Sequence, residues 1–295
     1  MVESLIIPSR IKLVRELIHL GADDEYDIIS ARFECLGNEV WLRASALLRM
    51  KVKGRNDELD TLVRLSPAFK YTSLRLTDLF DRLAQLEWMR EGMTKEPDMA
   101  EFAQHGITGV KSMWRPFMSL GIKDFHSDVA SLMDSIAALV MQVQGEIPTL
   151  KQSPGFSWVE KKGHSRKYVP ENILAIIDKT DSWWPTIKEV RDVLNHREHL
   201  KLVFGTPTDG ILFQVYEGPQ EPKILDSHLM HPNSHNVVDF GLYSAWVLSE
   251  MFVFLEDVGE QIADILKFGS MTPSMRMGNF KSIAASLEKL VAVAI

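Results

Sequence analysis

Apolar residues recur at intervals of three and four positions through most of the first 150 residues, the spacing that places side chains on one helix face. Ile11, Val14 and Leu17 begin this pattern. Glycine and proline interrupt it at Gly21, Gly54, Pro67, Gly121 and in the stretch 92–97. The pattern and its breaks predict helices over residues 9–20, 24–52, 70–91, 104–119 and 123–146.

The second half alternates between helical and strand-like patterns. Residues 156–169 place strand-like side chains on both sides of a polar turn, which predicts a short hairpin. The alternation of Ile211, Phe213 and Val215 before a Gly-Pro turn predicts a second hairpin within 210–230. The helical period predicts a helix after Pro170 and further helices over 182–203, 236–268 and from 279 to the C-terminus. The fold class is therefore predicted to be mainly α with two small β-hairpins.

Composition and charge narrow the function classes. The chain has 295 residues, of which 45% are hydrophobic and 25% charged, as in ordinary globular proteins. A net charge of -7 argues against a protein that coats nucleic acid through a positive field, although a local basic site stays open. The single cysteine, Cys35, cannot form an internal disulfide and suits a reducing cytoplasm. No signal peptide or membrane-length apolar run is evident, so we expect a cytoplasmic protein without membrane contact.

Several common catalytic motifs are absent from the sequence. It has no phosphate-binding P-loop, no dinucleotide-binding glycine motif, no zinc-protease helix motif and no serine-hydrolase elbow. A basic stretch remains, and its cations either contact phosphate or form a solvated turn. These cations are Lys161, Lys162, Arg166 and Lys167.

Histidines concentrate in one part of the chain. Five of the nine lie within 40 residues, and a histidine side chain titrates near neutral pH. They are His196, His199, His228, His231 and His235. Such a concentration suggests either acid–base chemistry or metal binding.

The first two histidines belong to the predicted helix 182–203. At 100° per residue, Arg191 and Asn195 project together from this helix. Asp192, His196 and His199 form an adjacent polar stripe. Such a stripe is either a solvated helix surface with local ion pairs or a functional face.

Arg191, Asp192 and His196 carry a resemblance to a known family. An arginine followed by a polar residue and, after four intervening positions, a histidine resembles the signature of the HEPN superfamily of helical domains. No other arginine of this chain has a histidine five to seven residues downstream. The resemblance extends over about residues 120–270, and its discriminating part is the segment 187–199.

The resemblance implies an up-and-down helical bundle formed by residues 121–295, with inserted hairpins. Residues 1–120 would then form an N-terminal helical region that is either separate or packed on the same core. Family members commonly form homodimers in which two copies of the motif face one cleft. Active members cleave RNA there without a metal or cofactor.

The resemblance also implies roles for individual residues. Arg191 would bind the scissile phosphate, and His196 would transfer a proton with the ribose 2′-hydroxyl. Asp192 would orient one of these two side chains. Asn195 and His199, which are not part of the signature, are additional supporting candidates on the same helix. A toxin or defence effector restrained by an antitoxin or another regulatory protein is the biological role that fits.

Two alternatives stay open. The same residues could form a noncatalytic dimeric module that binds a nucleotide or a protein partner, which the acidic net charge favours. Alternatively, Asp192, His196 and His199 could join histidines of the segment 228–235 in a metal site, since mixed histidine and carboxylate ligands suit zinc, manganese or iron.

Overall fold

The computed structural model of the chain describes residues 10–20, 56–96, 100–104, 107–143, 155–160, 163–196, 211–214, 229, 237–265 and 280–293. These residues are mainly α-helical, as the sequence pattern predicts. The helices are α1 (Arg10–Leu20), α3 (Asn56–Thr94), α4 (Arg115–Gln142), α5 (Glu171–Ile177), α6 (Trp184–His196), α7 (Phe240–Ile265) and α8 (Phe280–Val293). None of the described helices combines the length and apolar character needed to cross a bilayer.

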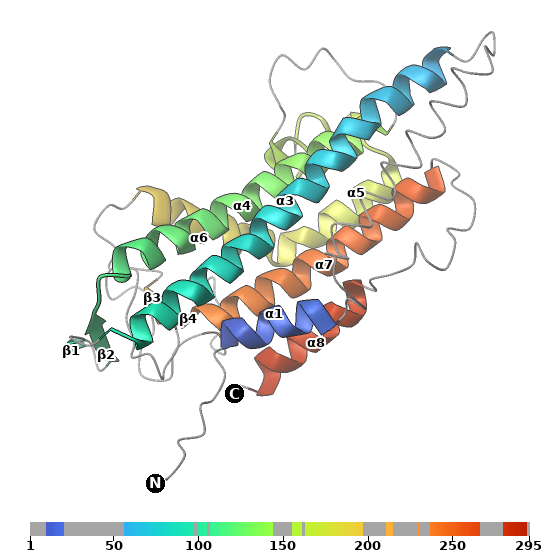
Figure 1. Cartoon of the computed structure of the whole chain (residues 1–295). Helices are drawn as coiled ribbons and strands as arrows, with labels where there is room; N and C mark the ends of the chain where they lie inside the picture. The colour runs from blue at the N-terminus through green and yellow to red at the C-terminus, as the bar shows by residue number, and fades with distance from the viewer. Residues whose placement is uncertain are drawn as a thin grey trace.

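Three long helices, α3, α4 and α7, form the body of an elongated bundle (Figure 1). Helix α4 packs against α3 and α6, and α7 packs against α1, α5 and α8. A hairpin of β1 (Ala100–Gln104) and β2 (Ile107–Lys111) lies between α3 and α4 at one end of the bundle. A second antiparallel pair joins β3 (Leu212–Gln214) to β4 (Val237–Asp239).

Helix α7 is the central helix of the bundle. Its sequence is apolar nearly all round, which is the pattern of a helix buried on every side. Two of its buried polar side chains are satisfied locally: Ser244 and Ser249 donate hydrogen bonds to the backbone oxygens of Gly241 and Trp246. The hydrophobic core therefore extends through α7 to α4 on one side and to α1 and α8 on the other.

The N-terminus of α7 holds α1 in place. Asp239 precedes the helix, and its Oδ1 accepts a hydrogen bond from the Leu242 backbone N–H at 3.1 Å, as a helix cap does. Its Oδ2 pairs with Arg10 Nη1 at 2.6 Å. A Cβ atom placed on Gly241 would lie 2.4 Å from Arg10 Cβ, so only glycine allows α1 to approach this closely.

A comparable contact joins α7 to α8. The Lys281 backbone N–H donates to Glu256 Oε2 at 2.7 Å, which places a carboxylate at the N-terminus of α8. Lys281 Nζ lies 2.7 Å from Asp257 Oδ1. Asp257 and the other acidic residues around it raise the pKa of Lys281.

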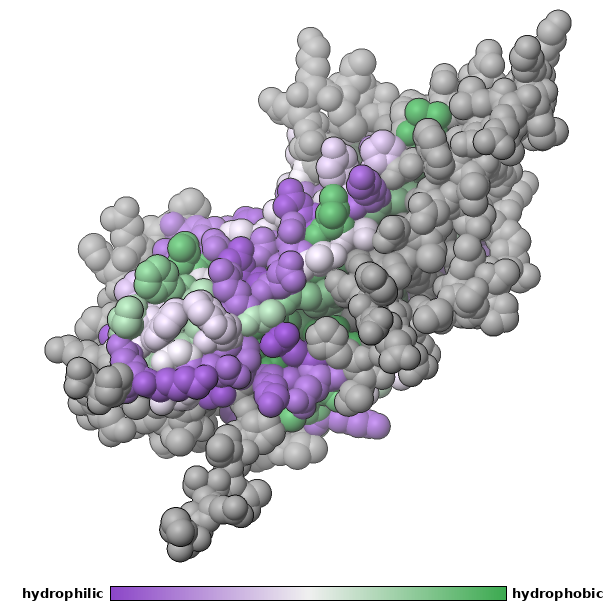
Figure 2. All heavy atoms as spheres, in the orientation of Figure 1, coloured by the Kyte–Doolittle hydropathy of each residue, from purple (hydrophilic) through white to green (hydrophobic). Residues whose placement is uncertain are grey.

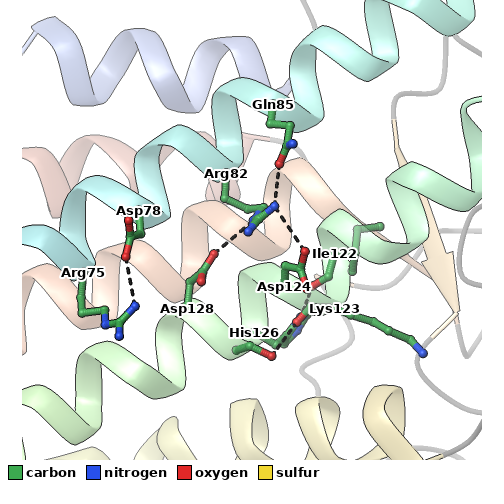
Figure 3. A network of polar contacts seen from close by, with 10 residues as sticks. Arg75, Asp78, Arg82, Gln85, Ile122, Lys123, Asp124, His126 and Asp128 are labelled. Atoms are coloured by element: carbon green, nitrogen blue, oxygen red, sulfur yellow. Dashed lines mark hydrogen bonds and ion pairs between the residues drawn. The ribbon is translucent and has the colours of Figure 1, made fainter.

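Helix α3 is fixed to α4 by an arginine between two carboxylates (Figure 3). Arg82 Nε lies 3.1 Å from Asp128 Oδ2, and Arg82 Nη1 lies 3.3 Å from Asp124 Oδ2. Burial raises the pKa of Asp128, and the bond and charge of Arg82 oppose that shift. These ion pairs add to the apolar contact between α3 and α4 and fix the register of the two helices.

The prediction that Pro67 ends a helix, with a new helix starting at residue 70, is wrong. Helix α3 continues through Pro67 from Asn56. A proline inside a helix removes one N–H donor and frees the carbonyl four residues earlier, which here belongs to Val63. Pro67 is exposed and Val63 is 44% exposed, so water can solvate that carbonyl. Buried residues on both sides of Pro67 keep the helix on the core.

The predicted helix 104–119 and the predicted break at Gly121 are also wrong. Residues 100–104 and 107–111 form the antiparallel β1–β2 pair, and α4 begins at Arg115 with Pro116 in its first turn. Gly121 lies inside α4, where an added Cβ would be 2.7 Å from Leu86 Cδ2. This glycine permits close packing of α4 on α3 and does not end the helix.

The predicted hairpin over 156–169 is replaced by two short 3₁₀-helices, Phe156–Trp158 and Arg166–Tyr168. Phe156 is buried against Trp184 and Phe254, and local turns satisfy the backbone. The prediction of a hairpin within 210–230 is correct for β3 only, because β3 pairs with β4, beyond that range. The described side chains of this pair, Leu212 and Phe213 in β3 and Val237, Val238 and Asp239 in β4, are all buried.

The remaining predictions concern positions and boundaries. Helices α1, α5, α7 and α8 lie where the helical period places them. Helix α6 begins within the predicted helix 182–203 and is described as far as His196. The predicted helix 24–52 lies outside the described residues. The expected boundary between residues 120 and 121 falls inside α4, and described residues on both sides of it share one hydrophobic core.

Candidate functional site

Helix α6 carries the arginine–histidine motif on an amphipathic scaffold. Its apolar residues face the core, with Trp184, Ile187, Val190 and Leu194 all buried. Their spacing of three, three and four residues is that of one helix face. The motif residues therefore lie to the side of the packed face, in the last turns of α6.

Asp192 holds the Arg191 guanidinium. Arg191 Nε and Nη2 donate hydrogen bonds to Asp192 Oδ1 at 3.0 Å and 2.8 Å. Arg191 is 29% exposed and Asp192 is 46% exposed. Asp192 lies on the helix stripe that position 196 shares, so the pairing turns the guanidinium toward that stripe. An aspartate that orients the arginine is one of the two arrangements that the HEPN resemblance implies.

The positive charge of Arg191 acts to lower the pKa values of two residues of α4. The first is His126, which is fully buried. Burial lowers the pKa of His126 to about 4, the bond to Ile122 opposes this shift, and the Arg191 charge adds to it. Since the Ile122 carbonyl can only accept, Nδ1 carries the proton and donates at 2.7 Å, while Nε2 accepts from the Tyr243 hydroxyl at 3.0 Å. His126 is a neutral structural histidine between α4 and α7.

The second residue is Asp134. Partial burial raises the pKa of Asp134, whereas the Phe156 backbone N–H, which donates to its Oδ1 at 2.6 Å, and the Arg191 charge lower it. Glu160 acts in the opposite direction and raises the pKa of Asp134. Asp192 therefore holds the Arg191 guanidinium, and the charge of the Asp134 carboxylate further reduces the net positive charge that Arg191 presents.

Glu160 also contacts the first residues of α6. Its Oε1 accepts a hydrogen bond from Trp184 Nε1 at 2.5 Å, and its Oε2 lies 3.5 Å from Lys188 Nζ. Phe156 packs against the Trp184 ring at 5.6 Å between centroids. These contacts fix the first turn of α6 near the Asp134 end of α4, and Arg191 then lies further along, between Asp134 and His126.

Asn195 is the other predicted site residue of α6 whose side chain is described. It is exposed and lies one turn after Arg191. His196 is the last residue of α6, and its side chain lies outside the described set, as do Lys161, Lys162 and His199.

Two cations of the basic stretch are described, and both have internal contacts. The guanidinium of Arg166 forms a two-pronged bond to Asp178, at 2.8 Å and 2.9 Å, and also donates to the Val159 carbonyl. Lys167 Nζ lies 4.9 Å from the centroid of the Tyr168 ring. The Arg166 guanidinium therefore joins neighbouring segments of the fold, and because its N–H groups are used in these internal bonds, it is less able to contact phosphate.

Sequence reasoning missed the two α4 residues, His126 and Asp134, whose pKa values the charge of Arg191 acts to lower. Asp134 interrupts a long apolar run between Met133 and Ile136, and a charged residue in such a run is a signal that could have been used. His126 offers no such signal, because its role depends on a partner 117 positions away.

The metal hypothesis finds no support among the described residues. No three histidine, cysteine or carboxylate side chains in that part of the chain converge as metal ligands. The histidines at 199, 228, 231 and 235 lie outside it.

Comparison with known proteins adds no further information about function. The chain matches no protein-family model, no curated protein and no solved structure.

Proposed function

We propose that this chain is an HEPN-like endoribonuclease in which Arg191 and His196 act on one phosphodiester. The observation that carries the proposal is the fixed guanidinium of Arg191, which Asp192 holds through two hydrogen bonds on the helix that ends at His196. The mainly α bundle around α6 is of the kind that the family resemblance implies.

In the proposed reaction, His196 removes the proton from a ribose 2′-hydroxyl. The 2′ oxygen attacks the adjacent phosphorus, and the bond from phosphorus to the 5′ oxygen breaks as that oxygen takes up a proton from water. The products are a 2′,3′-cyclic phosphate and a 5′-hydroxyl. Arg191 stabilises the negative charge that develops on the non-bridging oxygens, because a guanidinium stays charged and matches phosphate geometry.

The test is cleavage of single-stranded RNA by the purified protein in the presence of EDTA. We expect products that end in a 2′,3′-cyclic phosphate. His196→Ala should lower the cleavage rate about a hundredfold or more, and Arg191→Ala by a comparable factor. Asp192→Asn should have a smaller effect, since the amide oxygen still accepts one bond from Arg191.

The control is His164→Ala, which removes an exposed histidine outside α6 and should leave the rate unchanged. Circular dichroism of each variant separates loss of activity from loss of fold. Cleavage that survives His196→Ala would refute the assignment. Activity abolished by EDTA and restored by zinc or manganese would favour the metal alternative.

One observation favours a second function. Asp192 pairs with Arg191, the charges of Asp134 and Arg191 interact, and the whole chain carries a net charge of -7. Acidic surroundings weaken the affinity for a polyanion. The same helix would then serve in a noncatalytic dimeric module that binds a nucleotide or a protein, and a well-folded dimer that cleaves no RNA is the result that this alternative predicts.

A further inference from the structure

Large apolar side chains are exposed at the end of the bundle where α3 meets α4. Trp88, Met113, Phe117 and Leu120 are 61%, 66%, 55% and 56% exposed. The half-buried Trp114 lies behind them, with its ring centroid 5.0 Å from that of Trp88 and 6.4 Å from that of Phe117. We call these five residues the aromatic patch. Figure 2 shows pale and green side chains gathered at this end of the molecule, bordered by purple ones.

The aromatic patch is large for a surface that faces water permanently. Side chains of this size have about 150 to 250 Å² each, so the four exposed members present about 500 Å² together. The largest apolar patch of a typical monomer is about 300 to 600 Å² and is often functional. A stable interface buries about 800 Å² per partner, of which the apolar centre is the larger part. The aromatic patch has the size of such a centre.

The charges beside the patch are arranged symmetrically about Trp88. Asp81 lies seven residues before Trp88 and Lys95 lies seven residues after it, which is two helical turns in each direction. The Lys95 N–H bonds to the Gly92 carbonyl, so the turn at the end of α3 includes it. Both side chains are exposed, and neither has an ion-pair partner in the described part of the chain.

We propose that the aromatic patch binds a second copy of this chain, with the two α3 helices antiparallel across a two-fold axis at Trp88. In that arrangement each residue faces the one equally distant from Trp88 on the other side. Asp81 then faces the partner's Lys95, and the symmetry repeats this opposite-charge pair. Gln85 faces the partner's Glu91, so no like charges meet between residues 81 and 95. An isologous contact requires such self-complementarity.

This inference deepens the proposed function and rests on it only for the role of the dimer. Helix α6 starts beside Phe156, which is bonded to Asp134, and passes Arg191 toward the His126 level of α4. Its last residue, His196, therefore lies toward the N-terminal half of α4, where the aromatic patch begins. In an antiparallel contact through the patch the two bundles extend in opposite directions, so the C-terminal ends of both α6 helices lie toward the middle of the assembly.

The test is the oligomeric state of the full-length protein, measured by sedimentation velocity over a concentration series without RNA. We expect a dimer of twice 33.5 kDa. Asp81→Lys and Lys95→Asp should each raise the dimer dissociation constant about tenfold or more, because each places like charges opposite each other twice. The double variant should return it to within about threefold of the original value. Trp88→Ala should give monomers.

Lys289→Asp reverses an exposed charge on α8, away from the patch, and serves as the matched control that should leave the dimer unchanged. The charge reversals lie on the surface, so they remain informative if Trp88→Ala does not fold. A monomeric wild-type chain would overturn the inference. A dimer that resists all of these substitutions, or single reversals that the double variant does not rescue, would also overturn it. A rescued dimer that cleaves no RNA would refute the nuclease and leave this contact standing.

Discussion

Acid should weaken the fold through one buried histidine. His126 is completely enclosed and neutral, and burial lowers its pKa to about 4 from an ordinary value of 6.5. In the unfolded chain the same imidazole takes up a proton near its ordinary pKa. Between these two values the unfolded state binds more protons than the folded state, so the free energy of unfolding decreases as pH falls.

The size of this effect follows from the pKa difference. Each pKa unit corresponds to about 1.4 kcal/mol, so the full loss is about 3 kcal/mol once the pH is below both values. Lowering the pH from about 7.5 to about 5.5 should remove about 1.3 kcal/mol, and a further step to about 4.5 should bring the loss to about 2.5 kcal/mol.

Urea unfolding followed by tryptophan fluorescence measures this dependence. Burial raises the pKa values of Asp128, Asp134 and Asp239, which stabilises the fold as pH falls and masks the histidine in the wild-type curve alone. The comparison is therefore with His126→Gln, which cannot titrate but keeps the other groups. The difference in the free energy of unfolding between wild type and His126→Gln should change by about 2.5 kcal/mol between about pH 7.5 and about pH 4.5.

The matched control for that experiment is His164→Gln, because His164 is exposed. It should follow the wild-type curve at every pH. If the difference between wild type and His126→Gln stays constant over this pH range, His126 is not neutral and enclosed in the folded protein, and the reasoning is refuted.

Three substitutions test the contacts that hold the helices together, all measured by the same unfolding assay at neutral pH. Gly241→Ala should lower the free energy of unfolding by about 1 kcal/mol or more, because the added Cβ would displace Arg10, although alanine is the better helix former. An unchanged urea midpoint would contradict the close approach of α1. Asp239→Ala should cost about 2 kcal/mol, since it removes both the cap of α7 and the partner of Arg10. Arg82→Ala should cost about 1 kcal/mol by leaving the half-buried Asp128 carboxylate unpaired, and an Arg82→Lys variant should recover part of that loss.

Helical periodicity predicts the main elements of this fold because most of the helices bury one continuous apolar face. That signal places α5, α7 and α8 close to their observed positions. Periodicity fails at glycine and proline residues that usually end a helix but here lie inside one. Gly121 permits contact with Leu86, and the solvated Pro67 is tolerated inside α3, so two expected helix ends are absent.

The strands and the surroundings of the candidate site are harder to predict. The hairpin 100–111 is joined by only two residues, His105 and Gly106, and a glycine there is a hairpin signal that a helical interpretation overlooks. The pairing of Arg191 with Asp192 follows from neighbouring positions on one helix. The approach of Asp134 to Arg191 depends on how α4 and α6 pack, and a single sequence does not encode that contact in any local pattern.

The anchoring of α1 has a consequence for how the protein is made. Arg10 pairs with Asp239, 229 positions later in the chain, and α1 also packs against α8. During synthesis, α1 leaves the ribosome long before α7 and α8, so its binding partners do not exist until those helices have been made. Such a long closure is entropically costly and slows folding. The contact between α1 and α7 should therefore form among the last, and the nascent chain exposes the apolar face of α1 until then.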